Sequence, residues 1–166
     1  MKTTLVILAS VLLALTIIGV GFAAPVGNTD VGASVTVNGY KDVTVTPCAS
    51  PLSFGSLNPG TNDNPVIPGC VNGDVRVTNN PASNGAVAVT IKGTDFTGVP
   101  SGTIVIGQVG WDKDNTPLTT TAMTTIAASV ESALASGISA DMYFFLDVPS
   151  AQIAAAYSST FTVGTS

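Results

Sequence analysis

The sequence APVGNTDVGASVTVN, residues 24–38, ends in a pattern that predicts a β-strand with one apolar face. From residue 31 to residue 37, side chains of two kinds alternate with the period of two that a half-buried strand requires. The apolar face comprises Val31, Ala33, Val35 and Val37. A tether that contains Gly and Pro, residues 24–30, precedes the strand. Such a strand either completes its own domain or crosses to a neighbouring copy and completes that one.

An export segment comes before this strand. Lys2 supplies a short positive region, and residues 5–22 are nearly all apolar. Gly21 and Ala23 place small residues at positions −3 and −1 of a cleavage site, as a secretory signal requires. We therefore predict a signal peptide over residues 1–23 and a protein at the cell surface or outside the cell. The alternative is an uncleaved anchor, because the apolar run lies at the lower edge of what spans a bilayer.

Removal of residues 1–23 would leave 143 residues, enough for one domain with a proper core. We expect residues 24–38 to form the tether and strand and residues 39–166 to form the domain. Ten carboxylates then stand against four cations, a formal charge of −6. The cations are scattered, at Lys41, Arg76, Lys92 and Lys113. Nucleic acid is not an expected partner, because phosphate neutralisation needs clustered cations.

The sequence pattern of the domain, residues 39–166, predicts strands and turns. Segments rich in Val, Thr, Ile, Phe and Tyr are separated by clusters of Gly, Pro, Asn and Asp. The predicted strands are 31–37, 41–46, 51–55, 74–79, 86–93, 103–111, 123–129, 141–148 and 157–163. Their short, regular spacing predicts an all-β fold, an Ig-like or jelly-roll antiparallel β-sandwich, rather than βαβ units.

The register of two hairpins can be tested from the sequence. A three-residue loop over 38–40 places Val35 opposite Val43 and Ala33 opposite Val45, so the apolar faces agree, whereas a two-residue loop would bury the polar side. A loop over residues 79–85 predicts a second hairpin between 74–79 and 86–93. Its expected pairs are Thr78 with Ala86, Val77 with Val87, and Val75 with Val89.

One segment, residues 125–136, has some helical potential. It is rich in Ala, and Ile126, Val130 and Leu134 recur at intervals of four. Ser and Thr are frequent, however, and both flanks favour strands. We therefore expect a strand that ends near Val130, followed by a short helical turn or a loop.

The two cysteines, Cys48 and Cys70, are 22 positions apart. Outside the cell, such a pair predicts one disulfide, which could contribute about 3 kcal/mol in the chain-entropy model. Two independent thiols are the alternative. A metal site is not expected, because the chain has no His and two thiolates alone do not complete a tetrahedral site.

Little in the sequence indicates catalysis. Without His, neither a Ser-His-Asp nor a Cys-His arrangement can be built. Asp112 and Asp114 open a segment that is weakly similar to a calcium loop, but a turn stabilised by its own side chains is the simpler interpretation. We expect no enzyme activity, no cofactor and no small-molecule substrate. Trp111 could stack on a sugar, but the aromatic residues are expected mostly in the core: Phe54, Trp111, Tyr143, Phe145, Tyr157 and Phe161.

Several later phrases resemble a known group of proteins. They are Leu52-Ser53-Phe54-Gly55-Ser56-Leu57-Asn58-Pro59-Gly60, Thr90-Ile91-Lys92-Gly93-Thr94-Asp95-Phe96, Trp111, Tyr143-Phe144-Phe145-Leu146-Asp147-Val148-Pro149 and Tyr157-Ser158-Ser159-Thr160-Phe161-Thr162-Val163. Together they resemble archaeal secreted β-sandwich proteins, namely TasA/camelysin-type biofilm-matrix subunits and archaeal bundling pilins. The resemblance implies a sandwich, export by the general secretory route, and polymerisation by donor-strand complementation, with Val31, Ala33, Val35 and Val37 in the matching position.

The sequence thus favours a non-enzymatic subunit of an extracellular filament, a pilus or biofilm-matrix fibre. Its expected partner is itself, as a head-to-tail homopolymer that could associate into bundles. The alternative is a monomeric, secreted or membrane-anchored Ig-like envelope or adhesion domain. In that case the strand 31–37 would pair with 41–46 of its own chain.

Overall fold

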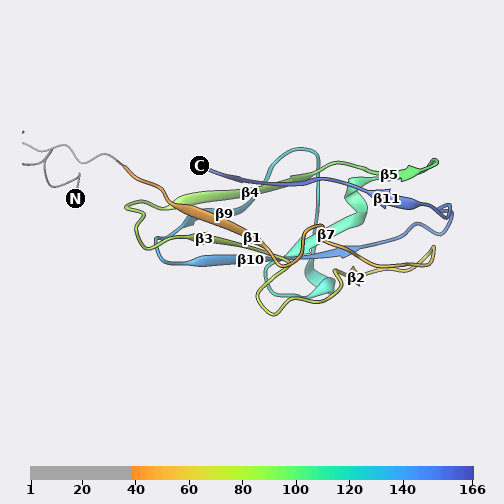
Figure 1. Cartoon of the computed structure of the whole chain (residues 1–166), viewed down its shortest axis with the longest axis horizontal. Coiled ribbons are helices and arrows are strands. Elements are labelled where there is room, and N and C mark those ends of the chain that lie inside the picture. Colours follow the sequence, from red (N-terminus) through yellow and green to blue (C-terminus); the bar gives the residue numbers. More distant parts are fainter. Residues whose placement is uncertain (1–38) are drawn as a thin grey trace, which may run out of the picture. The chain divides into compact units, whose positions relative to one another are not determined.

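The computed structural model describes residues 39–166, which belong to one compact unit (Figure 1). The predicted signal peptide and donor strand lie outside the described residues. Within residues 39–166 the fold is all-β and antiparallel, with two short 3₁₀ helices, η1 (Ile106–Gln108) and η2 (Pro117–Thr119). No helix in this part of the chain is long and apolar enough to cross a membrane. The predicted all-β sandwich is confirmed.

One layer of the sandwich is a sheet with the strand order β1-β3-β10-β7-β8, and β2 adds to β10 beyond the end of β3 (Figure 1). β3 and β10 occupy its centre, and their buried positions alternate along much of their length. Within residues 39–166, β1 pairs with β3 alone and lies at the edge of this sheet. The strands are β1 (Val43–Pro47), β2 (Asn64–Pro65), β3 (Val75–Asn79), β7 (Val109–Asp112), β8 (Thr121–Ala122) and β10 (Ser139–Leu146).

The second layer contains two three-stranded sheets, β12-β4-β9 and β11-β5-β6. The chain passes directly from one sheet to the other in two places, since β4 leads into β5 and β11 leads into β12. Thr94 N donates to Thr160 O at 3.1 Å where the ladders are interrupted. The strands are β4 (Val87–Gly93), β5 (Phe96–Val99), β6 (Thr103–Ile104), β9 (Ala128–Leu134), β11 (Ala156–Ser158) and β12 (Phe161–Thr165).

The core lies between these layers. Alternate residues of β3 and β4 supply Val75, Val77, Val87, Val89 and Ile91, all of them buried. Trp111 on β7 is buried as well, which agrees with its interpretation as a core residue rather than a sugar platform. Phe54 and Phe145 are also buried, whereas Tyr143, Tyr157 and Phe161 are half-buried.

The predicted hairpin between 74–79 and 86–93 is wrong. β3 pairs with β1 and β10, whereas β4 pairs with β9 and β12, so these two strands lie in different layers. The valines that we expected side by side in one sheet, Val77 with Val87 and Val75 with Val89, instead belong to strands on either side of the core. Thr78 and Ala86 do not pair either, since Thr78 lies in β3 and Ala86 precedes β4. An alternating pattern fits either arrangement, and the connection over residues 80–86 is long enough to cross between layers about 10 Å apart.

Several strand boundaries also differ from the expectation. Residues 51–55 form no strand, because Pro51 lacks an N–H and Gly55 has a φ of +73°. The predicted strand 103–111 is broken by η1 into β6 and β7, and 157–163 is divided into β11 and β12. The segment with helical potential is strand β9, which continues past Val130 to Leu134 and ends in a turn.

Asn79 links the two layers from inside the core. Its side chain is fully buried, and its Nδ2 donates to Leu134 O of β9 at 2.8 Å and to Gly85 O at 3.0 Å. Both hydrogen bonds of Nδ2 are therefore made inside the core, whereas the buried Oδ1 accepts none from the described residues. Asn79 therefore fixes the end of β3 against the opposite layer.

We expect Asn79→Ala to lower the free energy of unfolding by about 1–3 kcal/mol, because it leaves carbonyl oxygens without a donor. Urea unfolding followed by the fluorescence of the buried Trp111 measures the change. The neighbouring Asn80→Ala is the control, since Asn80 Nδ2 makes one exposed hydrogen bond to Thr44 Oγ1 at 2.9 Å. Equal effects of the two substitutions would contradict the cross-layer role.

Candidate functional site

The candidate functional site is an apolar groove between the layers, at the end of the domain that carries β5 and β11. Its volume is about 1010 Å³. One wall is the irregular segment 51–59, and the other is the segment 152–161, which contains β11. The floor is formed by buried apolar side chains from three other places in the chain: Phe96, Ile104, and the pair Leu146 and Val148.

A row of aromatic rings connects the two walls. Phe54 of the first wall lies 6.3 Å from Phe96, measured between ring centroids, with the planes at 65°. Phe96 lies 6.1 Å from Phe161, at 83°. Edge-to-face pairs of this kind add to the stability that area burial provides. These rings give the groove an apolar base where the layers separate.

The groove carries no charged side chain. Its described lining contains Leu, Ile, Phe, Ala, Pro and Val with Ser, Thr, Asn, Gln, Gly and Tyr, but no Asp, Glu, Lys or Arg. Such a surface offers neither an acid–base pair nor a ligand set for a metal. It suits a partner that brings apolar side chains and main-chain hydrogen bonds.

The wall 152–161 presents a strand edge that could receive another strand. β11 pairs with β5 and β12 pairs with β4, and each has no strand on its other side within residues 39–166. In the other wall, Ser53 O already accepts from Ile67 N at 2.6 Å, and Gly55 N donates to Ser53 Oγ at 3.1 Å. No hydrogen bond joins the two walls in the described part of the chain.

The same side of the sandwich stays open along β1. Val45 pairs with the fully buried Val77 and so belongs to the inner face of its sheet, yet 43% of Val45 is exposed. Pro47, also on this face, is exposed. On the opposite layer, Val163 of the edge strand β12 pairs with buried Ile91 but is itself only half-buried. Within residues 39–166, the inner side chains of these two edge strands are therefore only partly covered.

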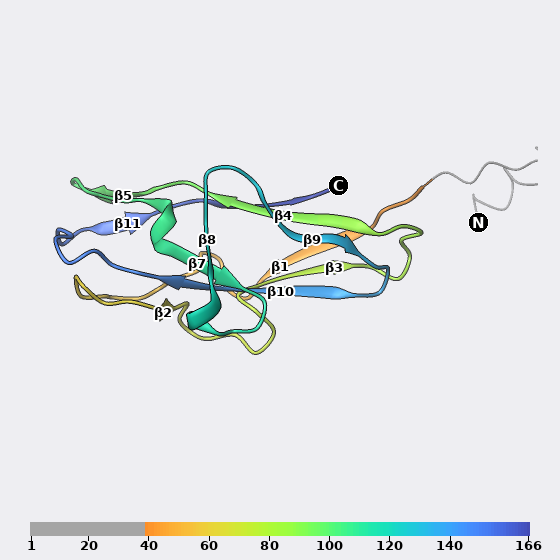
Figure 2. The ribbon, with the colours of Figure 1, turned by 180° about the vertical axis from the view of Figure 1, so that it is seen from behind.

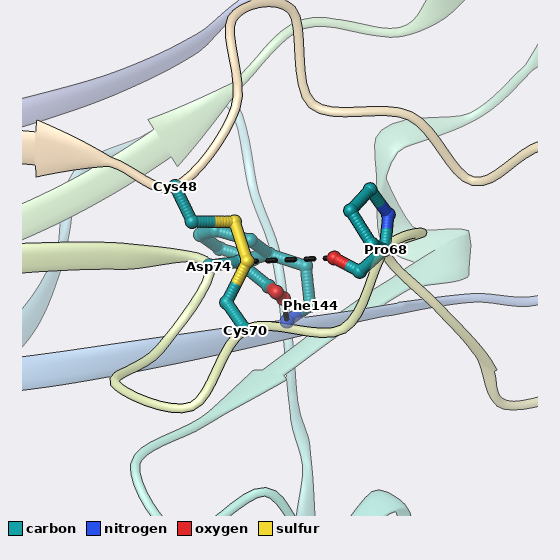
Figure 3. Close-up of a disulfide and its surroundings, with 5 residues drawn as sticks. All are labelled: Cys48, Pro68, Cys70, Asp74 and Phe144. Atoms are coloured by element: carbon teal, nitrogen blue, oxygen red, sulfur yellow. Dashed lines mark hydrogen bonds between the residues drawn. A yellow bond between two sulfur atoms is a disulfide. The ribbon is translucent and has the colours of Figure 1, made fainter.

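The disulfide Cys48–Cys70 fixes the start of the first wall (Figure 3). This agrees with the disulfide expected from the sequence. Cys48 N also donates to Asp74 O at 2.9 Å, and Cys70 Sγ lies 3.4 Å from Pro68 O. The groove wall 51–59 belongs to the loop that this disulfide closes. Further along, Gly60 N donates to Val148 O at 2.8 Å and holds the other end of the wall.

Asp74 lies behind the disulfide, with 3% of its surface exposed. Its Oδ2 accepts from Phe144 N at 2.8 Å, as Figure 3 shows. Burial raises the pKa of the Asp74 carboxyl above its ordinary value of 3.8, and the hydrogen bond from Phe144 opposes this only in part. Cys48, Cys70 and Asp74 are also the three metal-type ligands that residues 39–166 bring together, but the disulfide uses both sulfurs.

The other candidates from the sequence fall elsewhere. Val31, Ala33, Val35 and Val37 lie outside the described residues. Asp112 accepts from Asp114 N at 3.1 Å and from Thr116 N at 2.8 Å, so its carboxylate caps its own turn, as the simpler interpretation predicted. The groove was not predicted, because its walls are distant in the sequence. A segment rich in Pro and Gly at 51–60, with apolar Leu52, Phe54 and Leu57, is the one signal that could have indicated it.

The stability of the protein should depend on pH through Asp74. A folded-state pKa above 3.8 means that the folded chain holds this proton more tightly than the unfolded chain does. The resulting stabilisation is complete below pH 3.8 and is lost as the pH rises through the raised pKa. Asp74→Asn keeps an oxygen for Phe144 N and does not titrate. Urea unfolding of both proteins from pH 3 to pH 7 should therefore show the variant gaining relative stability as the pH rises; a difference that is independent of pH would contradict the raised pKa.

Comparisons of the chain with protein-family models, with curated proteins and with solved structures found no match. The groove and the partly covered edge strands beside it are therefore the features on which a function can be based.

Proposed function

We propose that this protein is the structural subunit of an extracellular filament that polymerises by donor-strand complementation. Residues 31–37 of one copy would enter the groove of the next copy and complete its open side. The observation that carries the proposal is the uncharged apolar groove, one wall of which ends in strand edges that have no partner strand within residues 39–166. An inserted strand would add main-chain hydrogen bonds and bury alternate side chains.

The donor segment matches this groove in chemistry. Its apolar face presents three valines and Ala33, and its other face presents Gly32, Ser34, Thr36 and Asn38. Neither face is charged, so insertion buries no unpaired charge. Burial of three Val side chains would contribute about 4–9 kcal/mol per junction before the cost of ordering the strand.

The place where residues 1–38 join the domain supports a donor from another copy. Tyr40 N donates to Asn84 Oδ1 at 2.6 Å, and Asn80 N donates to Asp42 O at 2.8 Å, which holds residues 40–42 at the loop between β3 and β4 (Figure 1). The groove lies at the other end of the domain. A segment that turned back at residues 38–40 would run beside β1 and reach the level of Pro47, short of the groove walls.

The alternative, a monomeric Ig-like domain, is favoured by one observation. β1 has an unpaired edge within the described residues, and its inner Val45 is poorly covered. The strand 31–37 of the same chain could cover this edge with Val35 opposite Val43, as the register test allowed. The two functions therefore differ in which chain supplies the strand and which part of the open side it covers.

The first test changes the two faces of the donor strand separately. In the mature chain, residues 24–166, Val35→Asp should abolish fibres or raise the concentration needed for assembly by about 100-fold or more, because it forces a charge into an apolar groove. Thr36→Asp is the matched control, since it places the same charge on the opposite face. Electron microscopy and sedimentation measure the result. A wild-type chain that stays monomeric, or equal effects of both substitutions, would refute the proposal.

A crosslinking experiment separates the two functions. One chain carries Val35→Cys, and a second, differently tagged chain carries Leu52→Cys in the groove wall. Mild oxidation should produce a dimer that contains both tags. In the monomeric alternative, a single chain with Val35→Cys and Val43→Cys crosslinks to itself instead, and the mixed dimer does not form.

A further inference from the structure

The two ends of the domain expose large apolar side chains. At the groove end, 74% of Val99 and 49% of Ile153 are exposed. At the opposite end, 56% of Tyr40 and 52% of Ile138 are exposed. Such side chains are unremarkable singly, but a pair at each end is of interest where a strand would connect one end to the other.

The first pair lies at the mouth of the groove. Ile153 belongs to the groove lining, and Val99 pairs with Ala156, which also lines it. The hairpin between β5 and β6 lies close to Ile153: a β-carbon placed on Gly102 of this hairpin would be 3.1 Å from Ile153 Cγ1. In both Figure 1 and Figure 2, β5 and β11 lie together at this end of the domain.

The second pair flanks the loop between β3 and β4. Asn84 N donates to Tyr40 O at 3.0 Å, and Asn79 N donates to Ile138 O at 3.0 Å. Tyr40 is also the second described residue of the chain, so the donor strand joins the domain next to it. The large side chain of Tyr40 therefore lies next to the point where the donor segment joins the domain.

The strand geometry brings the two ends together. Every strand pair in the described sheets is antiparallel, and a donor strand antiparallel to residues 156–161 would run from the middle of the domain toward the groove mouth. It would leave the acceptor there at Val37. Only Asn38 and Gly39 separate Val37 from Tyr40, a span of at most about 10 Å.

We propose that Tyr40 and Ile138 of one copy pack against Val99 and Ile153 of the copy that accepts its strand. This inference rests on the proposed function and adds a second contact to each junction. The strand supplies the attachment, and the end-to-end contact limits how far one domain can pivot about the two-residue tether. The partner is a second copy of this chain, because the tether is too short for another protein to lie between the two ends.

The test introduces charges on the two sides of the contact. In the mature chain, Val99→Glu and Tyr40→Lys should each raise the concentration needed for fibre assembly by about tenfold, because one side of an apolar contact becomes charged. The double variant places Glu of one copy beside Lys of the next and should recover most of the loss. Leu118→Glu is the control, since Leu118 is 89% exposed on η2 and belongs to neither end. Ile138→Lys is a second variant on the Tyr40 side, outside the groove lining, and thermal unfolding verifies that each variant folds.

The outcomes separate this inference from the proposed function. If Val35→Asp abolishes fibres while Val99→Glu, Tyr40→Lys and Ile138→Lys behave like Leu118→Glu, the end contact is wrong and donor-strand exchange stands. Effects that add in the double variant, without recovery, also overturn the contact. If fibres do not depend on Val35 at all, the proposed function itself fails.

Discussion

The structure depends on one constraint: a two-layer sandwich must cover the inner faces of its edge strands, and residues 39–166 leave one side only partly covered. β1 and β12 present residues such as Val45 and Val163 on the inner face, and their partners in the adjoining strands are fully buried while they are not. Beyond β1, the first layer continues on this side as the irregular segment 51–59. The layers separate there, and the groove opens between them.

The groove wall formed by residues 51–59 is fixed by a few separate contacts rather than by a ladder of hydrogen bonds. The Cys48–Cys70 disulfide fixes one end, and the bond from Gly60 N to Val148 O fixes the other. Phe54 anchors the middle against Phe96. These contacts hold the segment in place although it belongs to no strand. A strand that entered the groove would therefore not have to displace another strand from this wall.

The sequence predicted those features that depend on neighbouring residues, and it did not predict those that depend on contacts between distant segments. The period-2 pattern correctly located β3 and β4, because alternation along one strand depends only on which face is buried. It failed for their pairing, since Val77 and Val87 satisfy the pattern equally well as neighbours in one sheet or on either side of the core. The disulfide was predictable from the number of cysteines and the expected compartment. The groove was not, because it is built from segments about 100 residues apart whose meeting depends on the topology.

In the proposed assembly, the direction of the chain decides between a closed dimer and a fibre. A two-fold dimer requires that donor and groove lie where each copy can serve the other at once. Here the chain joins the domain beside Tyr40, whereas the groove mouth lies near Ile153, at the opposite end. Residues 87–99, which run between these ends, span about 40 Å at the rise of a strand. A reciprocal dimer would need two domains side by side and antiparallel, whereas the proposed packing of Tyr40 against Val99 places them end to end. In that arrangement each copy gives its strand to the next copy and accepts one from the copy before it, and the contact repeats without closing.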